Sequence, residues 1–360
     1  MPALIPTSTS PPPPNVVGPA TKRATRPSKQ LPQTLIEGAK IPNREQWDSE
    51  KHLAFQAPSK ILTMKEIGLE GHGISPNACS DPFPLFSEEA IKQMRAEIFS
   101  PPVLENCQYA STFNANMVRG MGHDLAPFTY DAWHSPETLA KISQVAGVEV
   151  VPAFDFDVAN INISVSDEKA AEVSFGEDKA RVDATKPVDG ADNDTLSSVA
   201  WHYDSFPFVC VVMMSDCTGM VGGETAVRKP NGEIIKVRGP STGTAVILQG
   251  RYIEHQALKA LGGRERITMV TSLRPKSPFV RDESVLTGVR GISNLDQLYH
   301  QYTEYRLEIL EERLRARSKY ERKLALAKKK YDIPNMRKFL EDQRGFIDSM
   351  LTELVEVEED

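Results

Sequence analysis

The sequence predicts an α+β protein, in which an antiparallel β-sandwich or barrel is flanked by helices and followed by a pair of C-terminal helices. Three patterns support this fold class. Residues 158–165 alternate apolar and polar side chains at a period of two, as a half-buried strand does. Further short apolar segments, separated by turns rich in Gly and Pro, continue to residue 273. In the last seventy residues the apolar side chains instead recur at helical spacing.

Two helices are expected before the strands, and each has a serine at the position that caps a helix N-terminus. Ser87 precedes a helix over residues 88–98, and Ser135 precedes one that reaches Val145, with Pro136 at its first position. The strands after residue 165 are expected at 206–215, 224–228, 234–237, 244–249, 252–255 and 266–273.

A long helix is expected over residues 295–324, with apolar side chains, Leu314 among them, along one face. Pro334 is expected to break it, because proline lacks the backbone N–H that a helix interior needs. A second helix follows over residues 336–354, Leu340 among its apolar side chains. Both helices are charged outside, so they suit an antiparallel pair that covers the core or joins two chains as a homodimer.

The chain is expected to divide into three regions. Residues 1–35 are rich in Pro, Ser and Thr without Asp or Glu, so this tail cannot bury enough apolar surface to fold. A transit peptide is the alternative for the tail, but its prolines would break the amphipathic helix required. Residues 36–290 form the β-rich domain, in which the polar residues 166–198 are a surface insertion or a lid. Residues 291–360 form the helical extension.

Composition limits the classes of partner. The chain has 42 Lys and Arg against 49 Asp and Glu, a net charge of −7, so it lacks the positive field that binds nucleic acids and anionic membranes. Its longest apolar runs are far shorter than the roughly 20 residues of a membrane span. The four cysteines include no Cys-x-x-Cys pair, which favours reduced thiols and a cytoplasmic location.

His202 and Asp204 are the first residues that indicate chemistry. They are two apart, so in an extended segment both side chains leave the same face. An imidazole and a carboxylate on one face are two thirds of the facial triad that holds non-haem Fe(II). Such a pair is also common by chance, so on its own it favours an ordinary structural histidine.

Further motifs follow at suitable intervals. They are Gly222-Gly223-Glu224-Thr225, then His255 after a turn, then Arg266 with Thr268 two residues on. An arginine and a hydroxyl on one strand face suit the binding of a carboxylate. Together with His202-x-Asp204, this order of motifs resembles the Fe(II)/2-oxoglutarate-dependent oxygenases over about residues 155–275.

That resemblance implies a double-stranded β-helix, a cupin-like jelly roll of eight core strands with flanking helices. It implies that His202, Asp204 and His255 bind Fe(II) and carry the catalysis. With O2 as oxidant, the implied reaction oxidises an unactivated C–H bond by hydroxylation, desaturation or ring closure. The co-substrate 2-oxoglutarate is converted to succinate.

The resemblance also implies an anchor for 2-oxoglutarate. Arg266 with Thr268 would bind the distal carboxylate of the co-substrate. Arg264 is the alternative anchor, although it lacks the hydroxyl two residues on that Arg266 has.

Four further residues are candidate substrate contacts. Asn160 and Asn162 share a strand face, where they would meet substrate or co-substrate, or else bond neighbouring backbone. Arg119 would pair with a substrate carboxylate, or else form a surface salt bridge. Phe346 would reach the site if the last helix folded over the barrel mouth.

The leading hypothesis is an oxygenase of amino acid oxidation or secondary metabolism that acts on a small molecule. Residues 201–216 resemble fungal small-molecule oxygenases of this superfamily, among them enzymes that convert free valine to an aziridine. Two alternatives stay open. One is a peptide or protein hydroxylase of the same fold, and the other is a non-catalytic jelly-roll protein whose terminal helices bind a partner.

Overall fold

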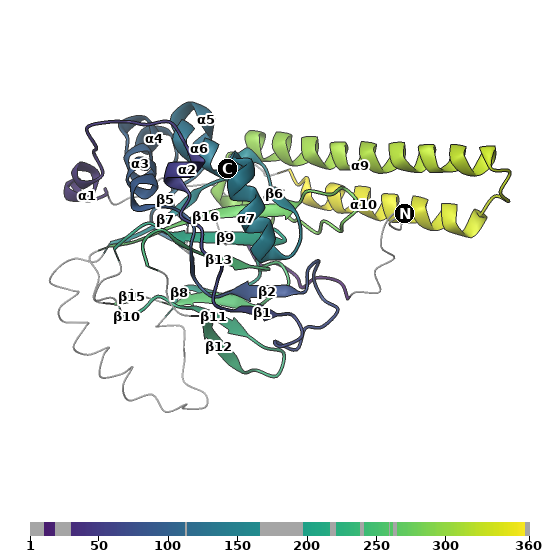
Figure 1. Ribbon diagram of the computed structural model, residues 1–360, viewed down its shortest axis with the longest axis horizontal. Coiled ribbons are helices and arrows are strands. Elements are labelled where there is room, and N and C mark those ends of the chain that lie inside the picture. The colour runs from purple at the N-terminus through teal and green to yellow at the C-terminus, as the bar shows by residue number, and fades with distance from the viewer. Residues whose placement is uncertain are drawn as a thin grey trace.

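Figure 1 shows the chain as a computed structural model. The structure describes residues 11–18, 30–111, 114–165, 197–216, 221–237, 241–258, 260–261 and 265–356. Most of the tail predicted at 1–35 and nearly all of the insertion predicted at 166–198 therefore lie outside the described residues, and so does Arg264.

The larger of two main sheets is antiparallel and is the layer on which the rest of the domain packs. Its strands run in the order β1 (Ile61–Thr63), β2 (Asn77–Ser80), β13 (Thr244–Leu248), β9 (Phe208–Met213), β16 (Glu265–Pro275), β7 (Asn160–Val165), β5 (Met117–Val118) and β4 (Gln108–Tyr109), with β3 (Phe83–Pro84) beside β13 and β6 (Val150–Pro152) beside β16. The strands predicted around residues 158–165, 206–215, 244–249 and 266–273 are confirmed to within a few residues.

The smaller main sheet is also antiparallel. Its strands run in the order β12 (Ile234–Val237), β11 (Thr225–Arg228), β14 (His255–Leu258) and β8 (Ser197–His202), and a separate pair joins β10 (Val221–Gly222) to β15 (Ala260–Leu261). The strand predicted at 252–255 is wrong. Tyr252 and Ile253 lie in a turn in which the Tyr252 N–H donates to the Gln249 carbonyl, 3.1 Å away, and their apolar side chains are buried in the core without being extended.

Short helices cover one face of the larger sheet (Figure 1). They are α1 (Gln33–Gly38), α2 (Ser49–His52), α3 (Glu88–Ile98), α4 (Pro101–Asn106), α5 (Gly122–Leu125), α6 (Pro127–His134) and α7 (Pro136–Ala146). Both predicted caps are confirmed, because the Ser87 hydroxyl accepts the Ala90 N–H at 3.2 Å and the Ser135 hydroxyl accepts the Thr138 N–H at 3.3 Å.

The period of two along the strands separates the two faces of the larger sheet. Cys210 and Val212 of β9 are buried in the core formed with the helices. Their neighbours Val209 and Val211 point to the opposite face, toward the smaller sheet, where both line a cavity. One face of the sheet therefore builds the core, and the other is available for a site.

The C-terminal pair of helices is confirmed as α9 (Leu295–Leu326) and α10 (Ile333–Glu353), which lie side by side and project from the sheets (Figure 1). Pro334 lies in the first turn of α10 and does not end α9, since the missing N–H of proline is tolerated there. The first half of α9 packs onto the domain through Leu298, Tyr302 and Ile309. This part of the pair therefore covers the core.

The outer half of the pair differs from the expected pattern. Leu314 and Leu340 are exposed, at 45% and 52%, whereas Arg313 and Arg317 are buried. Both buried arginines stack on aromatic rings; Arg313 also donates to the Pro278 carbonyl and Arg317 to the Asn335 side chain, which compensates for their burial. The exposed leucines leave apolar side chains on the outside of the pair, and the predicted homodimer stays a prediction. Within the described residues, every helix is too short or too polar to cross a bilayer.

Candidate metal centre

Three side chains of metal-ligand type converge in the described part of the chain. One ligand atom from each of His202, Asp204 and His255 lies within 4.8 Å of the other two. The two histidines are paired directly across β8 and β14, and Asp204 follows the end of β8, where its N–H donates to the Gly250 carbonyl at 2.9 Å. Strand pairing therefore places on one side of the smaller sheet residues that are far apart in sequence.

The ligand atoms of this cluster face one another. The Nδ1 of His255 is 2.9 Å from the Ile253 carbonyl, which can only accept, so Nδ1 carries the proton and Nε2 has a lone pair. That Nε2 lies 3.5 Å from Oδ2 of Asp204, and the Nε2 of His202 lies 3.4 Å from Oδ1. Oδ2 is buried without a hydrogen-bond partner among the described residues. A bound cation would satisfy Oδ2 of Asp204 and the Nε2 lone pair of His255.

The electrostatics favour metal-ligand forms at neutral pH. Burial lowers the pKa of His255 to about 4, so its imidazole is neutral. Burial alone would raise the pKa of Asp204, but the nearby His255, His202 and Arg251 outweigh it and hold that pKa below its usual value. The carboxylate is therefore ionised. Its charge and the neutral imidazole are what a divalent metal requires.

Gly250 leaves the space that the carboxylate occupies. A Cβ at this position would lie 1.8 Å from Oδ2 of Asp204, closer than any real contact. The turn after β13 therefore needs glycine, because the backbone passes directly beside the acidic ligand.

Replacing Gly250 by Ala is expected to weaken Fe(II) binding about 10- to 100-fold, the usual cost of misplacing a metal ligand. The measurement is anaerobic Fe(II) titration. Gly345→Ala is the control, since Gly345 lies within α10 and a Cβ there meets nothing within 4 Å. Equal affinities in Gly250→Ala and the wild type would show that Asp204 does not bind the metal.

The metal cluster opens onto a cavity of about 710 Å³ between the two main sheets. Its walls come from β8, β11 and β14 of the smaller sheet and from β7, β9, β13 and β16 of the larger one. Arg266 and Thr268 of β16 both line it, opposite Ser164 and Asn162 of β7. The structure thus places the predicted carboxylate anchor and the predicted metal ligands in one cavity.

The two predicted asparagines also line this cavity, and their bonds go to side chains rather than to backbone. Asn162 accepts from the Asn114 amide at 3.0 Å, and the Asn160 amide donates to Oδ1 of Asp157 at 2.8 Å. Arg119 lines the cavity as well. It forms a buried ion pair with Asp157 at 2.6 Å, so the alternative of a surface salt bridge is wrong.

Phe346 does not line the cavity. It is buried in the helical pair, with the guanidinium carbons of Arg306 and Arg313 at 3.7 and 4.4 Å from its ring centre. Because α10 packs along α9, none of its residues lines the cavity. Asp157, in contrast, lines the cavity but is not among the residues that the sequence predicted for the site. No sequence pattern marks it, because its partner Arg119 is distant in the chain.

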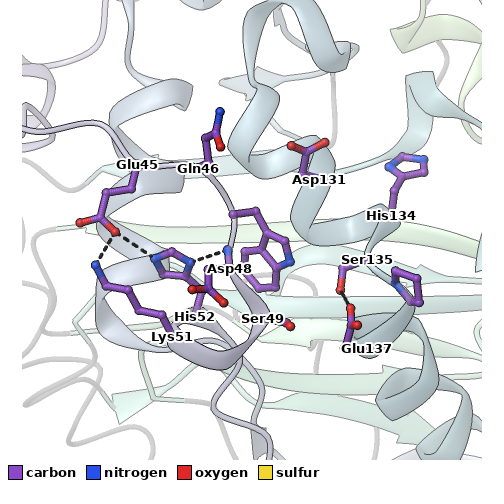
Figure 2. A pocket seen from close by; sticks show the side chains of 12 residues that line it. Glu45, Gln46, Asp48, Ser49, Lys51, His52, Asp131, His134, Ser135 and Glu137 are labelled. Carbon is purple, nitrogen blue, oxygen red and sulfur yellow. Dashed lines mark hydrogen bonds and ion pairs between the residues drawn. The ribbon is translucent and has the colours of Figure 1, made fainter.

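A second hollow lies on the surface between α2 and α6, and Figure 2 shows its polar lining. His52 is its buried histidine. Its Nδ1 accepts the Asp48 N–H at 3.0 Å, and its ring packs against those of Trp47 and Phe128. Nε2 faces Glu45 at 3.4 Å. His52 is therefore held by structural contacts, and the cavity between the sheets is the candidate site.

Comparison with known proteins gives weak likenesses. No family model and no curated protein matches the chain. It is similar to an oxidoreductase of the 2OG-Fe(II) oxygenase family from Burkholderia pseudomallei, at 12% identity and a TM-score of 0.30, over 44% of this chain and 65% of that one. The chain thus spans less than two thirds of that protein's length.

Two further solved structures are similar at the same level. One is SnoN, a non-heme alpha ketoglutarate dependent epimerase from nogalamycin biosynthesis (13% identity, 53% of this chain, 76% of that one, TM-score 0.34). The other is ThoJ, a non-heme monooxygenase in a nickel complex (12% identity, 66% of this chain, 96% of that one, TM-score 0.35).

Proposed function

We propose that this chain is an Fe(II)/2-oxoglutarate-dependent oxygenase that oxidises an unactivated C–H bond of a small molecule, either an amino acid or an intermediate of secondary metabolism. The observation that carries the proposal is the convergence of His202, Asp204 and His255, whose ligand atoms lie within 4.8 Å of one another at the cavity. Two imidazoles and one carboxylate are the donor set that holds non-haem Fe(II) with coordination positions left open.

The arrangement of strands supports a double-stranded β-helix as the core. Two antiparallel sheets contribute facing walls to a cavity, and the metal ligands come from the smaller one. The Gly-Gly-Glu motif, residues 222–224, connects β10 to β11, the second of which belongs to the smaller sheet. Gly223 has a φ of +77°, in the left-handed region that glycine adopts without strain.

Each group of residues has a distinct role in the proposed reaction. His202, Asp204 and His255 would hold the metal, and Arg266 with Thr268 would bind and orient one carboxylate of 2-oxoglutarate from the opposite sheet. Bound Fe(II), with 2-oxoglutarate and O2, would supply the oxidation of a C–H bond and release succinate. The apolar wall, with Val211 and Leu248, would exclude water from the reacting groups.

The position of the cavity between the two main sheets favours a small molecule over a peptide. It lies between two sheets, and its lining includes buried polar groups such as Asn160 and Thr268. A non-catalytic interaction protein has no use for two imidazoles and a carboxylate converging at a cavity. Succinate release measured with free amino acids and with peptides separates the two enzymatic alternatives.

The proposed function is tested by adding Fe(II) and 2-oxoglutarate to the metal-free protein without oxygen. We expect a weak visible absorption band that saturates with added metal, from charge transfer between Fe(II) and the co-substrate. Zn(II) in place of Fe(II) is the matched control and gives no band. A protein that stays colourless under saturating Fe(II) and 2-oxoglutarate would overturn the proposal.

A further inference from the structure

We infer that the C-terminal helical pair joins two copies of this chain into an antiparallel homodimer, through one apolar face to which both α9 and α10 contribute. The inference is independent of the proposed oxygenase activity, because the face lies outside the lining of the cavity. Six large apolar side chains, each between 38% and 66% exposed in the single chain, form the face. They are Leu307, Leu314, Leu340, Ile347, Leu351 and Leu354.

The six side chains lie on the same side of the pair, because each directly follows a buried residue. On α9, Leu307 and Leu314 follow Arg306 and Arg313, which both stack on the Phe346 ring of α10. On α10 the corresponding buried residues are Phe339, Phe346, Met350 and Glu353. One residue along a helix is a turn of about 100°. In two antiparallel helices of the same hand, that turn away from the shared contact points to the same side.

Two hydrogen bonds fix how the helices are aligned. Arg306 donates to the Ser349 hydroxyl, and Arg317 donates to Oδ1 of Asn335 at 2.7 Å. The residue number rises along α9 while it falls along α10, so the helices are antiparallel. Midway between the two bonds, residues 311–312 of α9 are level with residue 342 of α10.

The exposed charges of α9 change sign at this same level. Over residues 303–312, all of which the structure describes, the exposed charged side chains are acidic, and they are Glu304, Glu308, Glu311 and Glu312. Over residues 314–326, described throughout as well, they are basic, and they are Arg315, Lys319, Arg322 and Lys323. The half of α9 next to the domain is therefore negative, and the projecting half is positive.

This division of charge fits a second copy in one orientation. A two-fold axis at the charge boundary, perpendicular to the helices, lays α9 along α9 of the partner subunit in the opposite direction. Each acidic half then meets a basic half. The same axis passes between Leu340 and Ile347, which lie on either side of residue 342, so each of them meets the other type of side chain across the interface.

The other symmetric arrangement is unfavourable. A two-fold axis parallel to the helices would place the acidic half of α9 on the last part of α10 of the partner subunit. The exposed charges there are Asp348 and Glu356, which are also acidic. Like charges that face one another across an interface oppose binding. The charges therefore select the antiparallel arrangement, which leaves the two β-rich domains at opposite ends of a four-helix bundle.

The size and length of the face also fit a second copy. With 21 residues, α10 is about 30 Å long, and two helices side by side are about 20 Å wide. Two such faces cover about 1,200 Å² in total, which reaches the range of specific protein interfaces. A membrane that touched the tip of the pair would not cover this length, since Leu307 lies about 28 Å from the end of α9 at Leu326.

Sedimentation equilibrium of the full chain tests the inference. We expect a particle of twice the chain mass of 39.9 kDa. Leu314→Glu and Ile347→Glu should each raise the dimer Kd at least about 100-fold, because a symmetric interface would bury each added charge twice. Leu326→Glu is the matched control and should keep the wild-type Kd. Leu326 is 80% exposed and lies about 120° around α9 from Leu314.

Charge reversal tests the antiparallel arrangement. The chain with Glu304→Lys and Glu311→Lys, and the chain with Arg315→Glu and Arg322→Glu, should each self-associate at least about tenfold more weakly than the wild type, because like charges then meet. Mixing the two chains should restore a dimer. Tighter self-association of either chain alone would instead indicate the axis parallel to the helices and overturn the arrangement.

Three further outcomes would overturn the inference as a whole. One is a wild-type chain that stays monomeric at about 100 μM, too weak an association for a specific dimer. Another is a dimer with the same Kd in the wild type, Leu314→Glu and Ile347→Glu. The third is a monomer that sediments with vesicles of phosphatidylcholine and phosphatidylserine, which would assign the face to a lipid surface. All three leave the oxygenase proposal unaffected, since the substituted residues lie outside the cavity lining.

Discussion

Replacing any one of His202, Asp204 and His255 by Ala is expected to reduce succinate formation to the background rate and to weaken Fe(II) binding by more than about 100-fold. The three side chains converge within 4.8 Å, so no other described residue stands ready to replace a lost one. Replacing Asp204 also removes the one negative charge among the three ligands. The measurements are bound iron per chain and succinate released with 2-oxoglutarate.

His123→Ala is the control for these variants. Its side chain is 59% exposed and faces Asp131 at 3.8 Å, away from the cavity lining. It should leave both iron content and succinate release unchanged. Wild-type turnover in any folded triad variant would show that the convergence of the three side chains is not a metal centre.

Replacing Arg266 by Ala is expected to raise the KM for 2-oxoglutarate about 10- to 100-fold, since a charge-assisted bond to a carboxylate contributes about 1.5–3 kcal/mol. The kcat at saturating co-substrate should change little, because Arg266 lies on β16 while the metal ligands come from β8, β14 and the loop after β8. Arg266→Lys should recover part of the loss, since it keeps the charge but not the planar fork of donors.

Two controls assign this effect to one arginine. Arg274 lies on the same strand but outside the cavity lining, and its Nε donates to the Ala153 carbonyl at 3.1 Å. The KM of Arg274→Ala for 2-oxoglutarate should therefore equal that of the wild type. Arg264→Ala tests the alternative anchor and should also leave the KM unchanged. A raised KM in Arg264→Ala with a normal one in Arg266→Ala would exchange their roles.

Local patterns predicted much of the secondary structure. The strand expected at 234–237 is β12, and the serine caps at Ser87 and Ser135 are present, because both features depend on residues adjacent in the chain. The prediction failed at Tyr252 and Ile253. Their apolar character indicated burial correctly, but a turn buries side chains as well as a strand does.

The helical pair shows the same limit. Periodicity assigned Leu314 to the inner face, yet the buried position beside it is Arg313, whose Nε donates to the Pro278 carbonyl. Which face of an amphipathic helix is covered depends on the partner surface that the fold presents. Here that surface offers an aromatic ring and free carbonyls, which suit a guanidinium better than a methyl group.

For the site, the amino-acid order alone determined that His202 and Asp204 share a strand face, since their spacing matches the two-residue repeat of an extended chain. It also determined that Arg266 and Thr268 do so. Tertiary structure decided that His255 meets the first pair, that β16 faces them across a cavity, and that Arg119 pairs with Asp157. Strand pairing and sheet packing join residues distant in the chain, and no local spacing encodes which strands become neighbours.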